Sequence, residues 1–276
     1  EGCNPDWPAW LVYIFKYLYW LLLPPRVPTL FIISGYFFFR SQKDRDINFF
    51  VDKYKRRVHS LLIPYLVWNA VAIMLMYFRY DVIADNGYSF TDYMSGFWSS
   101  TINDNGMPAN NPLWFMRNLM VVTLMAPLIY YLVKVKYGFL AIILIAACYV
   151  TNINIPVCGI SFETILFFSI GAYLAIHRVD ITTIPRVLGI IMLLLYIPVQ
   201  LFMNALSADS NYLYCFDLLT SFVKITAVFY LVSLLFKKKI LKPTPGLSKI
   251  SFLLYALHGI VINPVIMLLY KLSGCT

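Results

Sequence analysis

Long apolar runs recur along this chain, and they restrict the environment in which it can fold. Hydrophobic residues make up 61% of the 276 residues and charged residues only 13%, with a mean hydropathy of +0.72. A soluble domain carries about 25% charged residues. Crossing a hydrocarbon core about 30 Å thick takes about 20 apolar helical residues, and backbone inside lipid must satisfy its own hydrogen bonds. The sequence therefore predicts an all-α fold, a polytopic transmembrane helical bundle.

We expect about eight membrane crossings in one integral membrane domain covering residues 1–276, because no polar stretch is long enough for a separate soluble domain. Gly35 predicts a bend in the first run. Residues 9–23 suit an interfacial helix or a half-span, and residues 89–101 suit a short interfacial helix. The expected membrane helices cover residues 27–40, 59–78, 112–133, 138–152, 161–177, 187–205, 213–236 and 250–270.

The charges of the loops alternate along the chain. Loop 40–57 carries seven Lys and Arg residues, whereas loop 79–111 is acidic. Cytoplasmic loops are enriched in Lys and Arg, so loop 40–57 is expected in the cytoplasm and loop 79–111 on the opposite side. The net charge of +9 then reflects topology and attraction to anionic membrane lipid. No nucleic acid partner is expected, and the spacing of His and Cys predicts no metal site.

Polar residues inside apolar helices are costly and therefore informative. Asp217 and Lys224 are seven residues apart in one expected helix, which places them on one face about 10 Å apart. A structural pair or a lysine that extends towards the interface is the more frequent explanation. Arg117 and Asn118 lie in the first turns of another helix. His258 lies several residues from the cytoplasmic end of the last run, where a packing role and a functional role are equally open.

The basic segment 53–57 has two explanations. Its cations can simply hold the helix end on the cytoplasmic side. They can also bind a phosphorylated cytoplasmic ligand through charge-assisted hydrogen bonds. Charge alone favours the first explanation, and the residues concerned are Lys53, Lys55, Arg56 and Arg57.

Four segments together resemble the membrane-bound acyltransferase-3 family. The family's Val-Pro-x-Phe-Phe-x-x-Ser-Gly-Phe/Tyr signature is similar to VPTLFIISGYFF at 27–38, and its basic loop with Ile/Leu-Pro-Tyr to KYKRRVHSLLIPYLVW at 53–68. Its Leu-Trp-Phe-Leu-x-x-Leu motif is similar to NPLWFMRNLMVVTLMAPLIYYL at 111–132, and its late Ser-x-x-Ser/Thr-Phe-x-x-Tyr-x-x-His element to SKISFLLYALHGIVI at 248–262. No segment is specific alone, but the four occur in the family's order.

The resemblance implies an integral multi-pass protein of the bacterial inner membrane, with about ten spans in full-length members. It implies an O-acyltransferase that moves an acyl group, acetyl first, from cytoplasmic acyl-CoA to a carbohydrate or lipid-linked glycan such as an exopolysaccharide. Acyl-CoA would be a co-substrate, with no permanently bound cofactor. Lys53, Lys55, Arg56 and Arg57 would bind the donor's phosphates, and His258 is the candidate catalytic residue. The residues expected to line the cavity are Ser34, Trp114, Arg117, Asn118, Asp217 and Lys224.

The sequence also departs from the family's pattern. The family's known catalytic Arg and His, about ten residues apart in its first helix, have no counterpart before the Ser-Gly-Tyr motif, and the nearest match to its Arg-x-x-Arg is Lys53-x-x-Arg56. We therefore expect an N-terminally truncated chain. Two alternatives stay open: a glycan or lipid transporter or flippase that uses Asp217, Lys224 and His258, and an inactive fragment with a structural role. We find no matched broken helices of the kind that inverted repeats produce.

Overall fold

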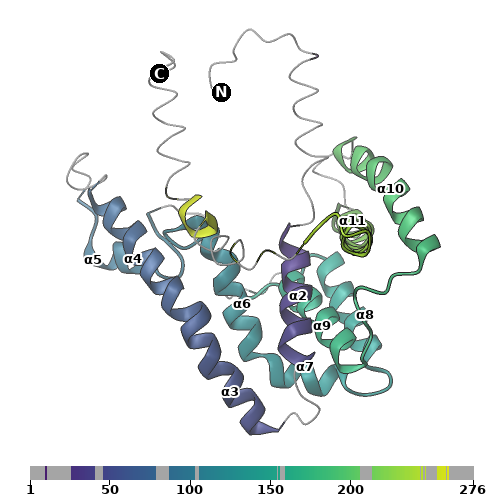
Figure 1. Cartoon of the computed structure of the whole chain (residues 1–276). Coiled ribbons are helices and arrows are strands. Elements are labelled where there is room, and N and C mark those ends of the chain that lie inside the picture. Colours follow the sequence, from purple (N-terminus) through teal and green to yellow (C-terminus); the bar gives the residue numbers. More distant parts are fainter. Residues whose placement is uncertain are drawn as a thin grey trace.

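The fold is helical throughout the part of the chain that the structure describes, a computed structural model covering residues 10, 26–40, 46–78, 87–102, 106–153, 155, 159–205, 213–242, 244, 246, 254–258 and 260. The expected all-α fold is confirmed there. Most of the expected segments 9–23 and 250–270 lie outside these residues. The helices, shown in Figure 1, are α2 (Arg26–Arg40), α3 (Ile47–Arg57), α4 (Ile63–Tyr77), α5 (Phe90–Ser95), α6 (Trp114–Leu124), α7 (Ala126–Val133), α8 (Gly138–Val150), α9 (Phe162–Ile176), α10 (Arg186–Ala205) and α11 (Leu213–Lys237).

The number of candidate membrane spans is smaller than the sequence predicts. Within the described ranges, three helices are long and apolar enough to cross a membrane: Ile47–Tyr77, Arg186–Met203 and Leu213–Lys237. The bent pair α6 and α7 makes a fourth if it is one span. Helices α2, α8 and α9 are apolar but have only 13–15 residues, about 20–23 Å of helix. The described chain thus has three or four candidate spans and several shorter apolar helices.

The first of these spans extends well before the predicted start at residue 59. The Asp46 side chain accepts a hydrogen bond from the Phe49 amide and starts α3 inside the expected loop 40–57. Helix α3 continues through a π-helical turn (Val58–Leu62) into α4, where the Ile63 amide bonds to the Val58 carbonyl. Pro64 follows and has no amide hydrogen to donate. The wider turn thus carries the helix past a proline.

Helices α6 and α7 form one apolar run with a sharp bend, whereas we predicted a single helix over 112–133. The two helices meet at Met125 at an angle of 60°. Pro127, the second residue of α7, cannot donate a backbone hydrogen bond. The Tyr54 hydroxyl donates to the Leu124 carbonyl at 3.2 Å, so α3 contacts the chain next to the bend.

Helices α2 and α9 pack side by side at the centre of the bundle, and glycines decide how closely (Figure 1). A Cβ added to Gly35 would lie 2.2 Å from the Phe168 carbonyl oxygen. One added to Gly171 would lie 2.0 Å from the Ile32 carbonyl oxygen. Each helix therefore presents a glycine to the backbone of the other. The bend expected at Gly35 is wrong, because α2 runs as one helix from Arg26 to Arg40.

A glycine also lies at the contact between α10 and α11. A Cβ added to Gly189 of α10 would lie 2.2 Å from the Tyr230 ring of α11. Here the neighbour is a side chain, which can move more easily than a backbone. The α2–α9 contact is consequently the stricter of the two.

We expect Gly35→Ala to destabilise the protein, because the new methyl group forces two backbones apart. Inserting a methyl group into a tight contact costs about 1–3 kcal/mol. Denaturant unfolding of the protein in detergent should show a lower midpoint. Gly246→Ala is the control, since its Cβ would meet no atom within 4 Å. Equal midpoints for the two variants would contradict the role given to Gly35.

Candidate functional site

The predicted donor-binding cations divide into two pairs on α3. Lys53 Nζ lies 5.6 Å from the centre of the Phe38 ring, and Arg57 Cζ lies 5.9 Å from the same ring. The two residues are one turn apart and half-buried, whereas Lys55 and Arg56 are exposed. The structure therefore brings Lys53 and Arg57 together over one aromatic ring and leaves the other two cations in the open.

Cations of other helices lie near the same end of the bundle. Arg40, the last residue of α2, lies over the Tyr36 ring at 5.2 Å. Lys134, just after α7, lies 4.3 Å from the centre of the Tyr131 ring. We call the four cations Arg40, Lys53, Arg57 and Lys134, with the rings beneath them, the basic–aromatic end. Besides the Tyr36 and Tyr131 rings beneath Arg40 and Lys134, it includes a packed cluster of rings with centroids 4.9–6.5 Å apart in the contacting pairs: Phe38, Phe39, Phe49, Phe50, Tyr130 and Phe168.

The contacts of these cations matter for what the end can bind. In the described part of the chain, Lys53, Arg57 and Lys134 contact aromatic rings rather than carboxylates. A ring attracts a cation without neutralising its charge. The ammonium and guanidinium groups can therefore still accept a phosphate as a partner.

A pocket of about 590 Å³ opens next to this end, between α3 and α7. A volume of this size suits a small ligand or part of a larger one. Its walls combine aromatic rings with an amide and a carboxylate, and are formed by Asp46, Ile47, Asn48, Phe50, Val51, Tyr54, Pro127 and Tyr131.

The opposite end of the bundle is held together by a polar network, which we call the loop end because segments 87–102 and 106–113 take part in it. The Tyr65 hydroxyl donates to the Phe97 carbonyl at 2.6 Å. Asn69 accepts from the Asn110 amide at 3.1 Å, and the Asn110 side chain donates to the Ala256 carbonyl at 3.1 Å. Both asparagines are buried. Three distant segments are thereby tied together at one place.

Residues of all four family-like segments take part in this end. The rings of Phe31 and Phe115 lie 4.8 Å apart, and those of Phe115 and Tyr255 lie 6.4 Å apart. The Tyr255 hydroxyl also donates to the Pro112 carbonyl. Tyr65 of segment 53–68 joins them through its bond to the Phe97 carbonyl. Each of the four family-like segments thus contributes at least one residue to this end: Phe31, Tyr65, Phe115 and Tyr255.

His258 lies at the loop end, whereas we expected it several residues from the cytoplasmic end of the last apolar run. Neighbouring Ala256 and Tyr255 contact Asn110 and Pro112, at the start of α6. An apolar run predicts a helix but not its position along the neighbouring helices. The polar contacts of Tyr255 and Ala256 determine that position. His258 Nδ1 lies 2.5 Å from the Tyr255 carbonyl oxygen. Because a carbonyl only accepts, Nδ1 carries the proton and Nε2 is left as the basic nitrogen.

Arg117 is buried with 4% of its surface exposed. Its Nη1 donates to the Trp98 carbonyl at 2.5 Å and to the Gly106 carbonyl at 2.9 Å, and its Nε donates to Asn118 at 3.3 Å. The guanidinium also lies 5.7 Å from the Trp98 ring. Arg117 therefore fastens the loop to α6, and Asn118 orients the Arg117 guanidinium.

The other residues expected around a cavity are spread over the bundle. Ser34 lies in α2 beside Gly35, and Trp114 begins α6, both half-buried. Asp217 of α11 accepts a hydrogen bond from the Tyr149 hydroxyl of α8 at 2.6 Å. Lys224 lies 5.9 Å from the Tyr196 ring of α10. Asp217 and Lys224 each contact a different helix, and their opposite charges still interact with each other.

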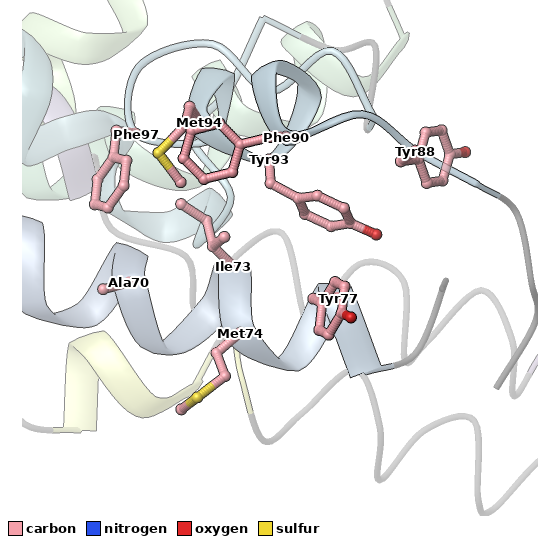
Figure 2. A pocket seen from close by; sticks show the side chains of 9 residues that line it. All are labelled: Ala70, Ile73, Met74, Tyr77, Tyr88, Phe90, Tyr93, Met94 and Phe97. Carbon is pink, nitrogen blue, oxygen red and sulfur yellow. The ribbon is translucent and has the colours of Figure 1, made fainter. Parts of the chain in front are cut away.

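A second pocket, of about 440 Å³, lies between α4 and the loop end. Figure 2 shows hydrocarbon and aromatic groups from α4 on one side and from α5 on the other. The hydroxyls of Tyr77 and Tyr93 point to the same end of the view, while Phe97 and Met94 lie at the other. The rings of Tyr77 and Tyr93 are 5.6 Å apart. This pocket suits an apolar ligand rather than phosphates.

Asn69 and Asn110 are functional candidates that sequence reasoning missed. Asn69 is a polar residue within the expected span 59–78, the signal that drew attention to Asp217. Tyr65 and Tyr255 lay inside the quoted motifs, but no pattern indicated that their hydroxyls hold the loop.

Known proteins give this arrangement a family. The family model described as an acyltransferase domain, Acyl_transf_3, matches residues 4–274. The chain belongs to the acyltransferase-3 family. It is 29% identical over 203 residues to the succinoglycan biosynthesis protein ExoH of Rhizobium meliloti (strain 1021), covering 66% of this chain and 51% of ExoH. The chain thus spans about half the length of that relative. No solved structure matches it.

The resemblance drawn from the four motifs is therefore confirmed, and membership in an integral membrane family agrees with the candidate spans.

We expect Arg117→Met to loosen the loop end, because the variant keeps the length of the side chain but donates no hydrogen bond. A hydrogen bond from a charged group contributes about 1.5–3 kcal/mol. Hydrogen exchange should therefore speed up about tenfold or more in segment 96–107. Arg186→Met is the matched control, because Arg186 is exposed. Unchanged exchange in segment 96–107 of the Arg117 variant would show that the loop is held by other contacts.

Proposed function

We propose that this chain is a membrane O-acyltransferase. It moves an acyl group, acetyl first, from cytoplasmic acyl-CoA to a hydroxyl of a carbohydrate or lipid-linked surface glycan. The observation that carries the proposal is the Lys53–Arg57 pair over Phe38, within the segment 53–68 that resembles the family's basic loop. In this proposal the basic–aromatic end faces the cytoplasm of a bacterial inner membrane, and about eight helices cross it.

The reaction sets chemical demands that the chain can be tested against. The acceptor oxygen attacks the thioester carbonyl carbon, a C–O bond forms, and the C–S bond breaks with its electrons leaving on the sulfur of CoA. An alcohol has a pKa far above 7, so a general base must take its proton. The oxyanion that develops on the carbonyl needs hydrogen-bond donors.

Positive charge supports the proposed donor site at the basic–aromatic end. Coenzyme A carries phosphates, and the four cations Arg40, Lys53, Arg57 and Lys134 come from three parts of the chain, each lying over an aromatic ring. The exposed Lys55 and Arg56 add to the local positive field, which attracts an anionic ligand at longer range. Lys53 and Arg57 therefore bind the phosphates directly in this proposal, and Lys55 and Arg56 assist their approach.

The acceptor end rests on His258 and on the named relative. In this proposal the Nε2 atom of His258, which does not face the Tyr255 carbonyl, takes the proton of the acceptor hydroxyl. ExoH is named for succinoglycan biosynthesis, which supports a polysaccharide acceptor. Helix α2 reaches from Phe31 at the loop end to Phe38 at the basic end. We propose that the thioester arm extends along this helix, because the phosphates and His258 lie at opposite ends.

Replacing Lys53 and Arg57 together by Ala should raise the KM for acetyl-CoA about 30- to 1,000-fold, since two direct phosphate contacts of roughly 1–2 kcal/mol each are lost. The assay uses the full-length protein in membranes, with labelled acetyl-CoA and glycan. Lys238→Ala/Lys239→Ala, which removes the same charge from exposed positions after α11, is the control. An unchanged KM would remove the proposed donor site.

Removing the exposed pair, in Lys55→Ala/Arg56→Ala, should have a smaller effect that salt abolishes. At 0.15 M ionic strength charges are screened over about 8 Å. The rise in KM should therefore be several-fold at low salt and vanish at high salt, whereas that of the Lys53/Arg57 variant persists. A salt-independent loss would mean that Lys55 and Arg56 contact the donor themselves.

His258→Gln should lower kcat about 10²- to 10⁴-fold if His258 takes the acceptor proton. Donor affinity should stay unchanged, because His258 lies away from the basic–aromatic end. A normal kcat would assign the base to another residue. Glycan uptake into proteoliposomes with no acyl transfer by the unaltered protein would instead support a transporter.

A further inference from the structure

We infer that the pocket between α3 and α7 holds the adenine base of the donor, so that the enzyme recognises the nucleotide half of coenzyme A. The inference rests on the proposed function, and it adds a subsite for a neutral aromatic base beside the phosphate site.

The walls of the pocket have the chemistry that a purine requires. Tyr54 and Tyr131 supply aromatic rings from two helices, next to the buried Phe50 ring. Successive bases stack on such rings in proteins that bind nucleotides. The Tyr131 side chain is 60% exposed, so its ring is accessible to a ligand. The volume of about 590 Å³ leaves space for the base and part of its ribose.

Asn48 supplies the polar recognition. Its Nδ2 donates to Asp46 Oδ2 at 3.3 Å, which uses one amide hydrogen. Among the described residues, the second amide hydrogen and the side-chain oxygen make no hydrogen bond to the protein, and Asn48 is exposed. An asparagine amide pairs with adenine through one donor and one acceptor at the same time. Asn48 can therefore distinguish adenine from bases with the opposite pattern.

Charge favours a base in the pocket rather than a phosphate. Asp46 lines the pocket, and its carboxylate repels an anion placed there. Cations lie along the adjoining stretch of α3 and at the pocket's edge. Lys53 follows Phe50 by three residues and Arg57 follows Tyr54 by three, each about 4.5 Å farther along the helix. Lys134 lies over the Tyr131 ring. Base and phosphates thus have adjacent, separate sites.

The test measures the binding of two ligands to three variants of the protein in nanodiscs. Coenzyme A has the nucleotide, and 4′-phosphopantetheine lacks it. Tyr131→Ala should weaken coenzyme A about 5- to 100-fold, the range found when a stacking ring is removed. It should leave 4′-phosphopantetheine unchanged. Tyr131→Phe should bind both ligands normally because it keeps the ring. Asn48→Ala should weaken only coenzyme A.

Tyr137→Ala is the matched control, because Tyr137 is 62% exposed, lies beneath Lys136 and does not line the pocket. It should change neither affinity. Equal weakening of both ligands by Tyr131→Ala, or none, would overturn the subsite while leaving the proposed function intact. If the unaltered protein binds adenosine 3′,5′-bisphosphate but not coenzyme A, the pocket is a nucleotide site outside acyl transfer, and the assignment to the donor falls. Failure to bind any of these ligands would count against the proposed function itself.

Discussion

The close contact of α2 with α9, at Gly35 and Gly171, determines where the candidate functional groups of this protein lie. It lets the backbones of α2 and α9 touch, with the Phe168 carbonyl set against Gly35. The Phe168 ring then packs 6.1 Å from Phe38. Phe38 in turn carries Lys53 and Arg57 over its face. A larger residue at Gly35 would therefore displace the ring on which the proposed phosphate site is built, although it contacts no cation itself.

The rings of the basic–aromatic end address a physical difficulty that any cytoplasmic phosphate site in a membrane protein meets. Lys53, Arg56 and Arg57 lie close enough on α3 to repel one another, and a carboxylate that paired with such cations would cancel their attraction for phosphate. Aromatic faces hold a cation in place by about 0.5–2 kcal/mol each while its charge remains. Rings also suit the edge of a membrane, where an amphipathic environment favours them. Some of the many Phe and Tyr residues of this chain would therefore serve to hold the cations of the proposed phosphate site.

The sequence allowed the helical class, the family and most helix bounds to be predicted, because apolar periodicity and motif order are local properties. Helices α8 to α11 lie within two residues of the expected limits. The errors fell where tertiary contacts decide. Gly35 indicated a bend, but a glycine that frees a helix and one that admits a neighbour look the same in sequence. The Pro127 bend and the extension of α3 back to Ile47 depended on Tyr54 and on the Asp46 cap.

The candidate site was predictable in part for the same reason. Positive charge identified the segment 53–57, but only the helix phase shows that Lys53 and Arg57 share one ring while Lys55 and Arg56 face away. Arg117 was expected to line a cavity and instead binds two loop carbonyls, a partner choice that sequence spacing does not encode.

The two ends of the bundle differ in how they obtain rigidity, and this difference fits a division of labour. At the loop end, buried amides and hydroxyls bond to backbone carbonyls, as Asn110 does with Ala256 and Tyr65 with Phe97. Such bonds have narrow geometry, which suits the placement of a base at a reacting oxygen. At the basic–aromatic end, cations rest on rings, whose attraction varies gradually with position. That tolerance suits a flexible phosphate-bearing donor, which must enter, bind and leave in each turnover. An acyl transfer across this bundle would thus combine an adaptable donor end with a rigid acceptor end.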